Sequence, residues 1–352
     1  GQDASKLLQS LATNNFLKEE TMPLATAFLT PKGRVMGDAL AFPITDELEP
    51  TGPHWLLDVS ANSLPSLLRH LKMYKLRAKV SLRDASKDFD TWVLYGDSNW
   101  LSECRGTLQD KMESSQGGGF LGFDPRYLNN SSVDSLRVAV PRESFIDLPA
   151  LLPSASVAVP EMYDWVRLSQ GLAEGSELVG RIPLECNIDL LNGVAFDKGC
   201  YIGQELTART HFKGQVRKRL LPMMVTSGLV SEEEGEHGYE MPPLQWEDMA
   251  RTNHSLAKEP SEDTELAPVA AVGDKIMDLG SSKVIGEVVA SVAAVGQVFP
   301  PYPIVAQIRI GGMNQSNDIS MAITGADYSL PAKPFYPSWW PVLDPKTGKV
   351  PS

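Results

Sequence analysis

The pattern of apolar residues changes at Arg219, and this change constrains the fold more than any other feature of the 352-residue chain. Before Arg219, short runs typical of strands alternate with stripes typical of helices. After it, the apolar runs at 220–226, 284–292 and 304–310 are typical of strands and are separated by glycines. We therefore predict an α+β part followed by a closed or nearly closed small β-domain.

The part before Arg219 begins with a predicted hairpin and a helix. Residues 25–29 and 35–42 flank the turn signal Pro31-Lys32-Gly33, which is typical of a hairpin. Residues 64–74 carry leucines at helical spacing. Further strands are predicted at 54–59, 79–82, 91–95 and 135–139, and short helices at 5–11, 162–170, 174–177 and 203–210.

Two later segments differ in composition from the rest. Residues 231–268 are rich in Glu and Asp and cannot bury enough apolar surface to order themselves, so we expect a solvated insertion in the β-domain. An acidic docking arm is the functional alternative. Residues 331–341 combine prolines with aromatic residues, and we expect them to lie across the surface with their rings packed.

Composition limits the partners and the compartment. With a formal net charge of −12, the chain does not bind nucleic acid through its overall charge. No apolar run is long enough to span a bilayer, and we expect neither nucleic acid nor membrane as a partner. Three scattered cysteines indicate a reducing compartment rather than a disulfide framework. Because residue 1 is glycine, we expect a trimmed N-terminus, with any targeting segment before Gly1 out of view.

Cys200 is the leading candidate for chemistry. It lies in the segment Lys198-Gly199-Cys200-Tyr201-Ile202-Gly203-Gln204-Glu205, just before a predicted helix. The glycines allow a sharp turn, and a helix N-terminus favours the thiolate, as would a nearby lysine ammonium. A thiolate is both a nucleophile and a soft metal ligand. The alternative is a buried, inert cysteine.

The sequence does not complete a site around Cys200 by itself. His211 would lie about 16 Å away along a helix, too far for a Cys-His pair. Cys186 lies beside Glu185 and could be a second ligand, but the two cysteines do not have the spacing of a zinc or cluster motif. A metal centre would therefore need further ligands from a partner protein.

The segment 198–205 resembles the signature of folate-binding relatives of the glycine-cleavage aminomethyltransferase, in the branch devoted to iron–sulfur cluster assembly. The continuation 206–220 is similar to the mitochondrial member of that branch. Weaker matches follow in order at 3–15, 29–38, 74–80, 182–185 and 285–288. The resemblance covers nearly the whole chain.

The resemblance implies an α+β fold in which three domains form a ring, with two α+β domains and a C-terminal β-barrel. The implied boundaries are 1–45 with 130–218 for a discontinuous folate-binding-type domain, 46–129 for a ferredoxin-like domain, and 219–352 for the barrel, which carries the acidic insertion 231–268. A central pocket of folate size is also implied.

The resemblance further implies a non-catalytic factor of the mitochondrial matrix that matures [4Fe–4S] proteins. It would be a monomer alone and a heterodimer with an A-type iron–sulfur scaffold protein, and Cys200 would hold a [2Fe–2S] cluster jointly with that scaffold. The implied tetrahydrofolate site includes Asp38, Glu185, Lys198 and Arg209. The Glu185 carboxylate could accept two N–H bonds from the pterin edge, or it could serve only as a structural partner.

A tetrahydrofolate-dependent aminomethyl or methyl transferase is the alternative function, and it would use Asp38 and Glu185. The aminomethyltransferases carry two adjacent acids in the first hairpin, where this chain has Gly37-Asp38. Because one acid is absent, the sequence favours the assembly factor over the enzyme.

Overall fold

The computed structural model describes residues 1–18, 23–44, 54–114, 119–127, 133–144, 146–226, 269–292, 302–310 and 321–351. The predicted acidic insertion 231–268 lies outside these residues. Packing divides the chain into two compact units: unit 1 comprises 1–157 and 174–212, and unit 2 comprises 158–173 and 213–352. The predicted boundaries of three domains stay a prediction.

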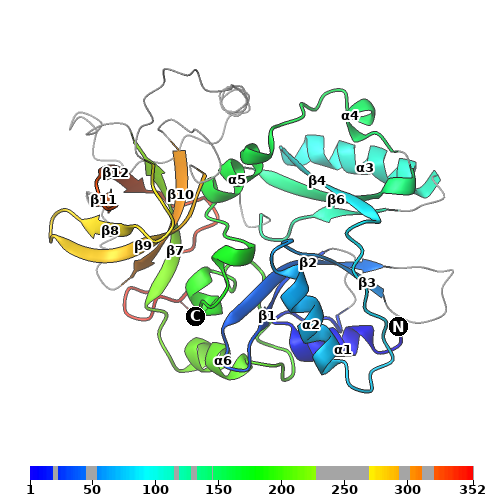
Figure 1. Ribbon diagram of the computed structural model, residues 1–352, viewed down its shortest axis with the longest axis horizontal. Coiled ribbons are helices and arrows are strands. Elements are labelled where there is room, and N and C mark those ends of the chain that lie inside the picture. The colour runs from blue at the N-terminus through cyan, green and yellow to red at the C-terminus, as the bar shows by residue number, and fades with distance from the viewer. Residues whose placement is uncertain are drawn as a thin grey trace. The chain divides into compact units, whose positions relative to one another are not determined.

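The first sheet of unit 1 contains the predicted hairpin. Strand β1 (Leu24–Leu29) pairs antiparallel with β2 (Val35–Ile44), which pairs with β3 (His54–Asp58). Helices α1 (Ala4–Leu11) and α2 (Leu64–Tyr74) lie beside this sheet (Figure 1). They pack on it through leucines spaced for one helical face. The predicted strand at 79–82 is wrong, because those residues join no sheet.

The second sheet of unit 1 has the order β4-β5-β6 along the chain and β4-β6-β5 in space. Its strands are β4 (Phe89–Gly96), β5 (Phe120–Phe123) and β6 (Asp134–Pro141). Helix α3 (Ser98–Ser114), which the sequence reading missed, covers it through Leu101, Cys104, Leu108 and Met112. The remaining short elements of unit 1 are η1 (Arg142–Ser144), α4 (Leu148–Leu151), η2 (Gly175–Glu177) and η3 (Pro183–Cys186), followed by α6 (Gln204–Phe212).

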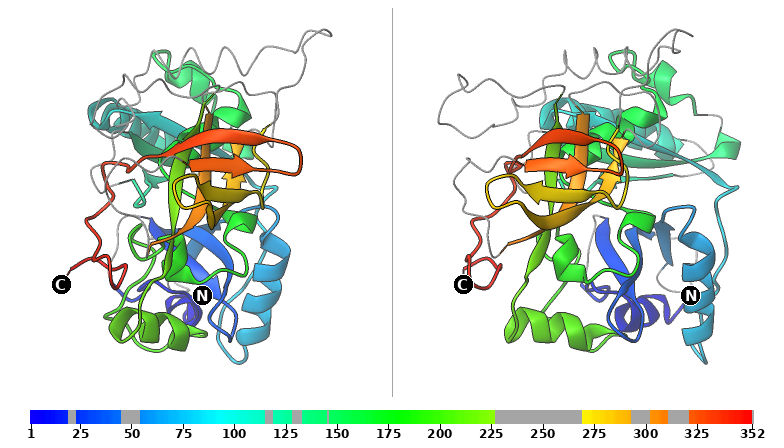
Figure 2. Two further views of the ribbon diagram at one scale, coloured as in Figure 1. Left: turned by 90° about the vertical axis from the view of Figure 1, so that its left-hand side faces the viewer. Right: turned by 60° about the vertical axis from the view of Figure 1, so that its left-hand side comes forward.

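Unit 2 is a closed antiparallel barrel, as predicted, with α5 (Pro160–Ser169) packed against it. The barrel strands are β7 (Lys218–Val225), β8 (Lys275–Asp278), β9 (Lys283–Ser291), β10 (Tyr302–Arg309), β11 (Met321–Thr324) and β12 (Ser329–Pro334). The barrel strands close in the order β10-β7-β12-β11-β8-β9 (Figure 2). Most side chains of the barrel core are Val, Ile, Met and Ala.

The proline-aromatic segment at 331–341 differs in part from the prediction. Its first residues complete β12, which pairs with both β11 and β7. The rings that follow are buried at Phe335 and Trp339, and the Trp339 indole N–H donates to the Gln170 carbonyl after α5 at 3.0 Å. The segment is thus a part of the barrel and its packing rather than a surface covering.

Candidate functional site

The cysteine loop of unit 1 connects residue 198 to the start of α6. The Cys200 side chain is exposed, which excludes the inert buried alternative, whereas Cys104 and Cys186 are buried. Helix α6 begins four residues after Cys200, so the predicted place before a helix N-terminus is confirmed. Within the loop, the Gln204 side chain accepts from the Tyr201 N–H at 3.1 Å and closes the turn into the helix.

Gly203 fixes how the cysteine loop meets the first hairpin. It has φ +80°, and a Cβ there would overlap the Thr30 carbonyl oxygen of the β1–β2 turn. On the other side of this contact, a Cβ on Gly33 would come within 2.7 Å of the Leu206 Cβ. Gly199, by contrast, has open space around it and no positive φ, so the expected need for both loop glycines applies to Gly203 alone.

The Lys198 ammonium holds the loop against the end of α1. Its Nζ donates to the carbonyls of Ala12 at 2.6 Å and Asn14 at 2.7 Å, and lies 4.8 Å from the centre of the Tyr201 ring. Burial lowers the pKa of Lys198 to about 8. Lys198 therefore acts first on loop geometry, by binding the free carbonyls at a helix C-terminus.

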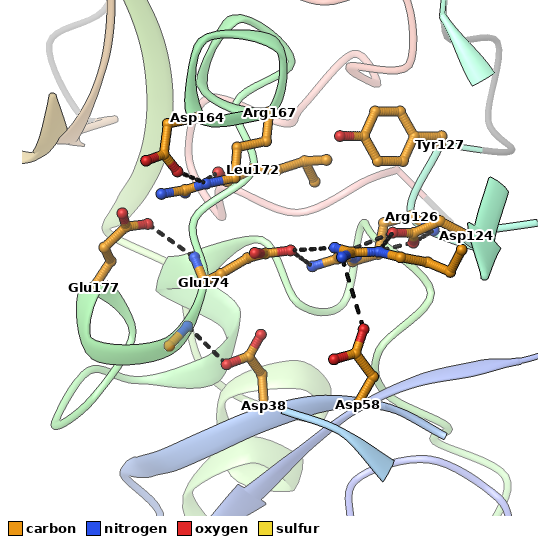
Figure 3. A network of polar contacts seen from close by, with 12 residues as sticks. Asp38, Asp58, Asp124, Arg126, Tyr127, Asp164, Arg167, Leu172, Glu174 and Glu177 are labelled. Atoms are coloured by element: carbon orange, nitrogen blue, oxygen red, sulfur yellow. Dashed lines mark hydrogen bonds and ion pairs between the residues drawn. The ribbon is translucent and has the colours of Figure 1, made fainter. Parts of the chain in front are cut away.

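A second polar site of unit 1 surrounds Asp38. Asp38, on β2, accepts the N–H of Gly175 at 2.8 Å (Figure 3). Burial, and then the nearby Glu174 carboxylate, raise the pKa of Asp38 to about 6. Burial also raises the pKa of Asp58 at the end of β3. A carboxyl with a pKa near 6 exchanges protons close to neutral pH.

Two arginines join the acids of this site into a network. Arg126 donates twice to Asp124, at 2.9 and 2.6 Å, and its third nitrogen lies 2.6 Å from Glu174. Arg137, on β6, reaches the same Glu174 oxygen at 3.2 Å and lies 3.7 Å from Asp58 (Figure 3). Glu174 thus accepts from both guanidinium groups, which ties the segment before η2 to the second sheet. The next residue, Gly175, and Arg137 reach the first sheet through Asp38 and Asp58.

Sequence reasoning found Asp38 but missed the other members of this network, Asp58, Asp124, Arg126, Arg137 and Glu174. The strand pattern gave no signal for Arg137, because its side chain lies on the face of β6 opposite to Leu136 and Val138, which alternation predicts to be solvated. Two more candidates lie elsewhere: Glu185 is half-buried in η3, and Arg209 is exposed on α6.

No group of three His, Cys, Asp or Glu side chains suited to a metal ion occurs in the part of the chain that the structure describes. Cys186 is 2% exposed, so its thiol does not share the surface with Cys200. Cys200 could thus supply one ligand, and a cluster bound there would need others from a second molecule. Among the described helices, none has the length and apolar character needed to cross a bilayer.

The comparison with solved structures defines the class of fold. The chain is similar to the glycine cleavage system aminomethyltransferase T of Bartonella henselae, with a TM-score of 0.60 and 12% identity over 96% of this chain and 82% of that one. The chain therefore has the aminomethyltransferase-like α+β fold, as predicted. At this identity the likeness shows the fold alone. A scan against models of protein families found no match.

Curated relatives define the family. A protein of Mycosarcoma maydis, named as a mitochondrial iron–sulfur cluster assembly factor IBA57 homologue, is 30% identical over 97% of this chain and 81% of its own length. Proteins with the same name from Aspergillus oryzae and Dictyostelium discoideum are 37% and 32% identical over 65% and 64% of this chain. The chain belongs to this family of mitochondrial assembly factors, which confirms the resemblance. It spans 54% of the A. oryzae relative and 59% of the D. discoideum one.

We predict that Gly203→Ala destabilises unit 1 by about 2–4 kcal/mol, since it adds strain at positive φ and an overlap with the Thr30 carbonyl. Urea unfolding followed by tryptophan fluorescence measures the change. Gly199→Ala is the matched control and should leave stability within about 0.5 kcal/mol. Equal losses in the two variants would contradict the role given to Gly203.

We predict that Asp38→Asn stabilises the protein above about pH 7 by about 1–2 kcal/mol. The folded state raises the pKa of Asp38 from 3.8 to about 6, so folding favours the protonated form and ionisation at higher pH costs stability. The partial solvent contact of Asp38 places the effect below the full value of the shift.

The gain from Asp38→Asn should shrink as pH falls through about 6 and vanish near 3.8, where the native carboxyl is also neutral. Unfolding free energies measured across this pH range test it. Thr107→Ser, at an exposed position of α3, is the control: it changes no titratable group and should show no such trend. A constant difference at all pH values would show that Asp38 does not titrate as described.

Proposed function

We propose that this chain takes part in iron–sulfur cluster assembly in the mitochondrion, where Cys200 is its point of contact with the cluster. Its family membership supports the general role and the compartment, and the relatives carry both in their names. The observation that carries the specific proposal is an exposed thiol on a loop fixed by Lys198 and Gly203. A thiolate is a ligand that clusters use.

The finer parts of the proposal are the matrix as location, an A-type scaffold protein as partner, and [4Fe–4S] proteins as the products served. A single exposed cysteine fits a shared site better than a resident one, because a [2Fe–2S] cluster takes four protein ligands. In this proposal the protein is a monomer alone and a heterodimer when the scaffold brings the cluster. The cluster is then cargo rather than a permanent cofactor.

We predict that the visible circular dichroism of a [2Fe–2S] cluster on an A-type scaffold changes when this protein is added, and that Cys200→Ser abolishes the change. The hydroxyl is a poor substitute for the thiolate as a soft ligand. Asp197→Asn is the control because it alters a neighbouring exposed residue and keeps the thiol. If Cys200→Ser gave the same spectrum and the same affinity, Cys200 would not be a ligand.

Tetrahydrofolate is the second ligand that we propose, and Asp38 and Glu185 are its candidate partners. Both are carboxylates in unit 1, and carboxylates suit the N–H donors of a pterin edge. We assign Lys198 to holding the cysteine loop rather than to binding folate, because its ammonium already donates to two carbonyls. Arg209 is exposed on α6, and we assign it to contact with an acidic partner protein rather than with folate.

The raised pKa of Asp38 favours one alternative function, a tetrahydrofolate-dependent transferase with Asp38 as general base. Calorimetry with tetrahydrofolate tests the step that both folate hypotheses need. We expect binding to the native protein and an affinity at least about tenfold lower in Glu185→Gln, which loses one charge-assisted acceptor. Absence of heat with the native protein would remove folate and the transferase together, and would leave the Cys200 proposal intact.

A further inference from the structure

Helix α2 and the loop after it have a charge that is opposite to that of the whole chain. Residues 60–83 contain no acidic residue, although the formal net charge of the protein is −12. The same stretch carries six cations: Arg69, Lys72, Lys75, Arg77, Lys79 and Arg83. The net charge of the whole chain does not describe this face, and the lack of a bilayer-spanning run, which argued against a membrane partner, does not bear on docking at a membrane surface.

Most of these cations are exposed and have no acidic partner. Arg69, Lys72, Arg77 and Lys79 are exposed, and Lys75 is half-buried. Arg83 pairs with Asp88, but no ion pair to the other five occurs among the described residues. We call these five residues the α2 cationic face. One carboxylate lies against this segment, since Asp3 accepts the backbone N–H of Lys79 at 2.8 Å. The five cations outnumber it, and they create a positive potential over a distance of about 10 Å at moderate salt.

Two exposed apolar side chains lie within this face. Arg69, Lys72 and Met73 follow each other at helical spacing, on the side of α2 away from the buried Leu67 and Leu71. Met73 is 60% exposed and Leu76 is 84% exposed. Figures 1 and 2 show the loop that follows α2 extending past both α1 and α2.

Leucine at position 76 disfavours folding in two ways. It follows the C-cap residue Lys75 and has φ +46°, in the left-handed region where helices usually place glycine. A leucine there adds about 1 kcal/mol of backbone strain compared with glycine. Its side chain also remains in water and so regains nothing by burial. Folding alone does not account for leucine at this position.

From this arrangement we propose that the α2 cationic face docks on a bilayer surface with anionic headgroups, with Leu76 and Met73 inserted among the acyl chains. The combination of protruding apolar side chains and surrounding cations is the one that interfacial anchors use. A bilayer accepts an apolar tip without a shaped pocket, whereas a protein partner would need a complementary cavity for Leu76. Nucleic acid would use the cations and leave both apolar side chains in water.

Sedimentation with vesicles tests the proposal. The native protein should bind vesicles of equimolar phosphatidylcholine and phosphatidylglycerol, and binding should fall with rising salt. The triple variant Arg69→Gln, Lys72→Gln, Arg77→Gln should bind about a hundredfold more weakly, at about fivefold for each cation removed. Leu76→Gly should bind about tenfold more weakly through lost insertion.

Leu76→Gly also separates docking from folding. Glycine adopts φ +46° without strain, so the thermal unfolding midpoint of Leu76→Gly should equal or exceed that of the native protein. Val272→Ser, which replaces a 61% exposed side chain in unit 2, is the control and should bind as the native protein does. If the triple variant does not fold, Leu76→Gly alone decides.

Equal binding to vesicles of phosphatidylcholine alone, or unchanged binding of Leu76→Gly, would overturn the proposal. Binding to polyglutamate or to RNA, with none to the anionic vesicles, would do the same and would assign the face to another class of partner. The variants that test vesicle binding do not alter Cys200, which is exposed on the loop before α6. The outcome is therefore independent of the cluster experiment with Cys200→Ser.

Discussion

The close contact between the first hairpin turn and the start of α6 is the constraint on which the rest of unit 1 depends. Gly203 lies against the Thr30 carbonyl, and Leu206 lies against Gly33. The turn leads directly into β2, which carries Asp38, and the helix is preceded directly by the loop that carries Cys200. One backbone contact therefore sets the position of both candidate sites, although they are far apart in the sequence.

The polar network around Glu174 has a different role from that of the apolar cores. Ion pairs that are largely buried add little net stability, because desolvation offsets most of their attraction. Removing one member would nevertheless leave a buried charge without its partner, at a large cost. The network of Arg126, Arg137 and Glu174 thus selects one arrangement of the two sheets in unit 1. Burial raises the pKa of Asp38 and of Asp58, and the neighbouring Glu174 carboxylate raises both further.

Local sequence patterns were sufficient for most regular elements. The hairpin, α1, α2 and the barrel strands β7, β9 and β10 have strong periodicity or turn signals, and they occur within a few residues of the predicted positions. Helix α3 was missed although its buried residues have helical spacing, because Gly106 and many polar residues weaken the pattern. Strand β12 was missed because its prolines argue against a strand.

The two candidate sites differ in how far the sequence reveals them. The Cys200 segment is continuous, so its glycine, lysine and helix start could be read together. The Asp38 network is assembled from β2, β3, β6 and two loops, and no local pattern links Asp124 to Glu174. Such a site depends on tertiary folding and becomes visible only with coordinates. Even within the continuous segment, the partners of Lys198 at Ala12 and Asn14 come from the other end of the unit.

The path of the chain between the two units has a consequence for the order of folding during synthesis. All residues of unit 1 have been synthesised once residue 212 leaves the ribosome. Its two parts, 1–157 and 174–212, are separated in the sequence by 158–173, which belong to unit 2. That segment, with α5, belongs to a barrel whose first strand begins at Lys218 and whose last ends at Pro334. Met162, Trp165 and Val166 of α5 therefore lack their final packing until the later barrel strands have been synthesised. During that interval the chain exposes the apolar side of an amphipathic helix, which is a surface that favours aggregation.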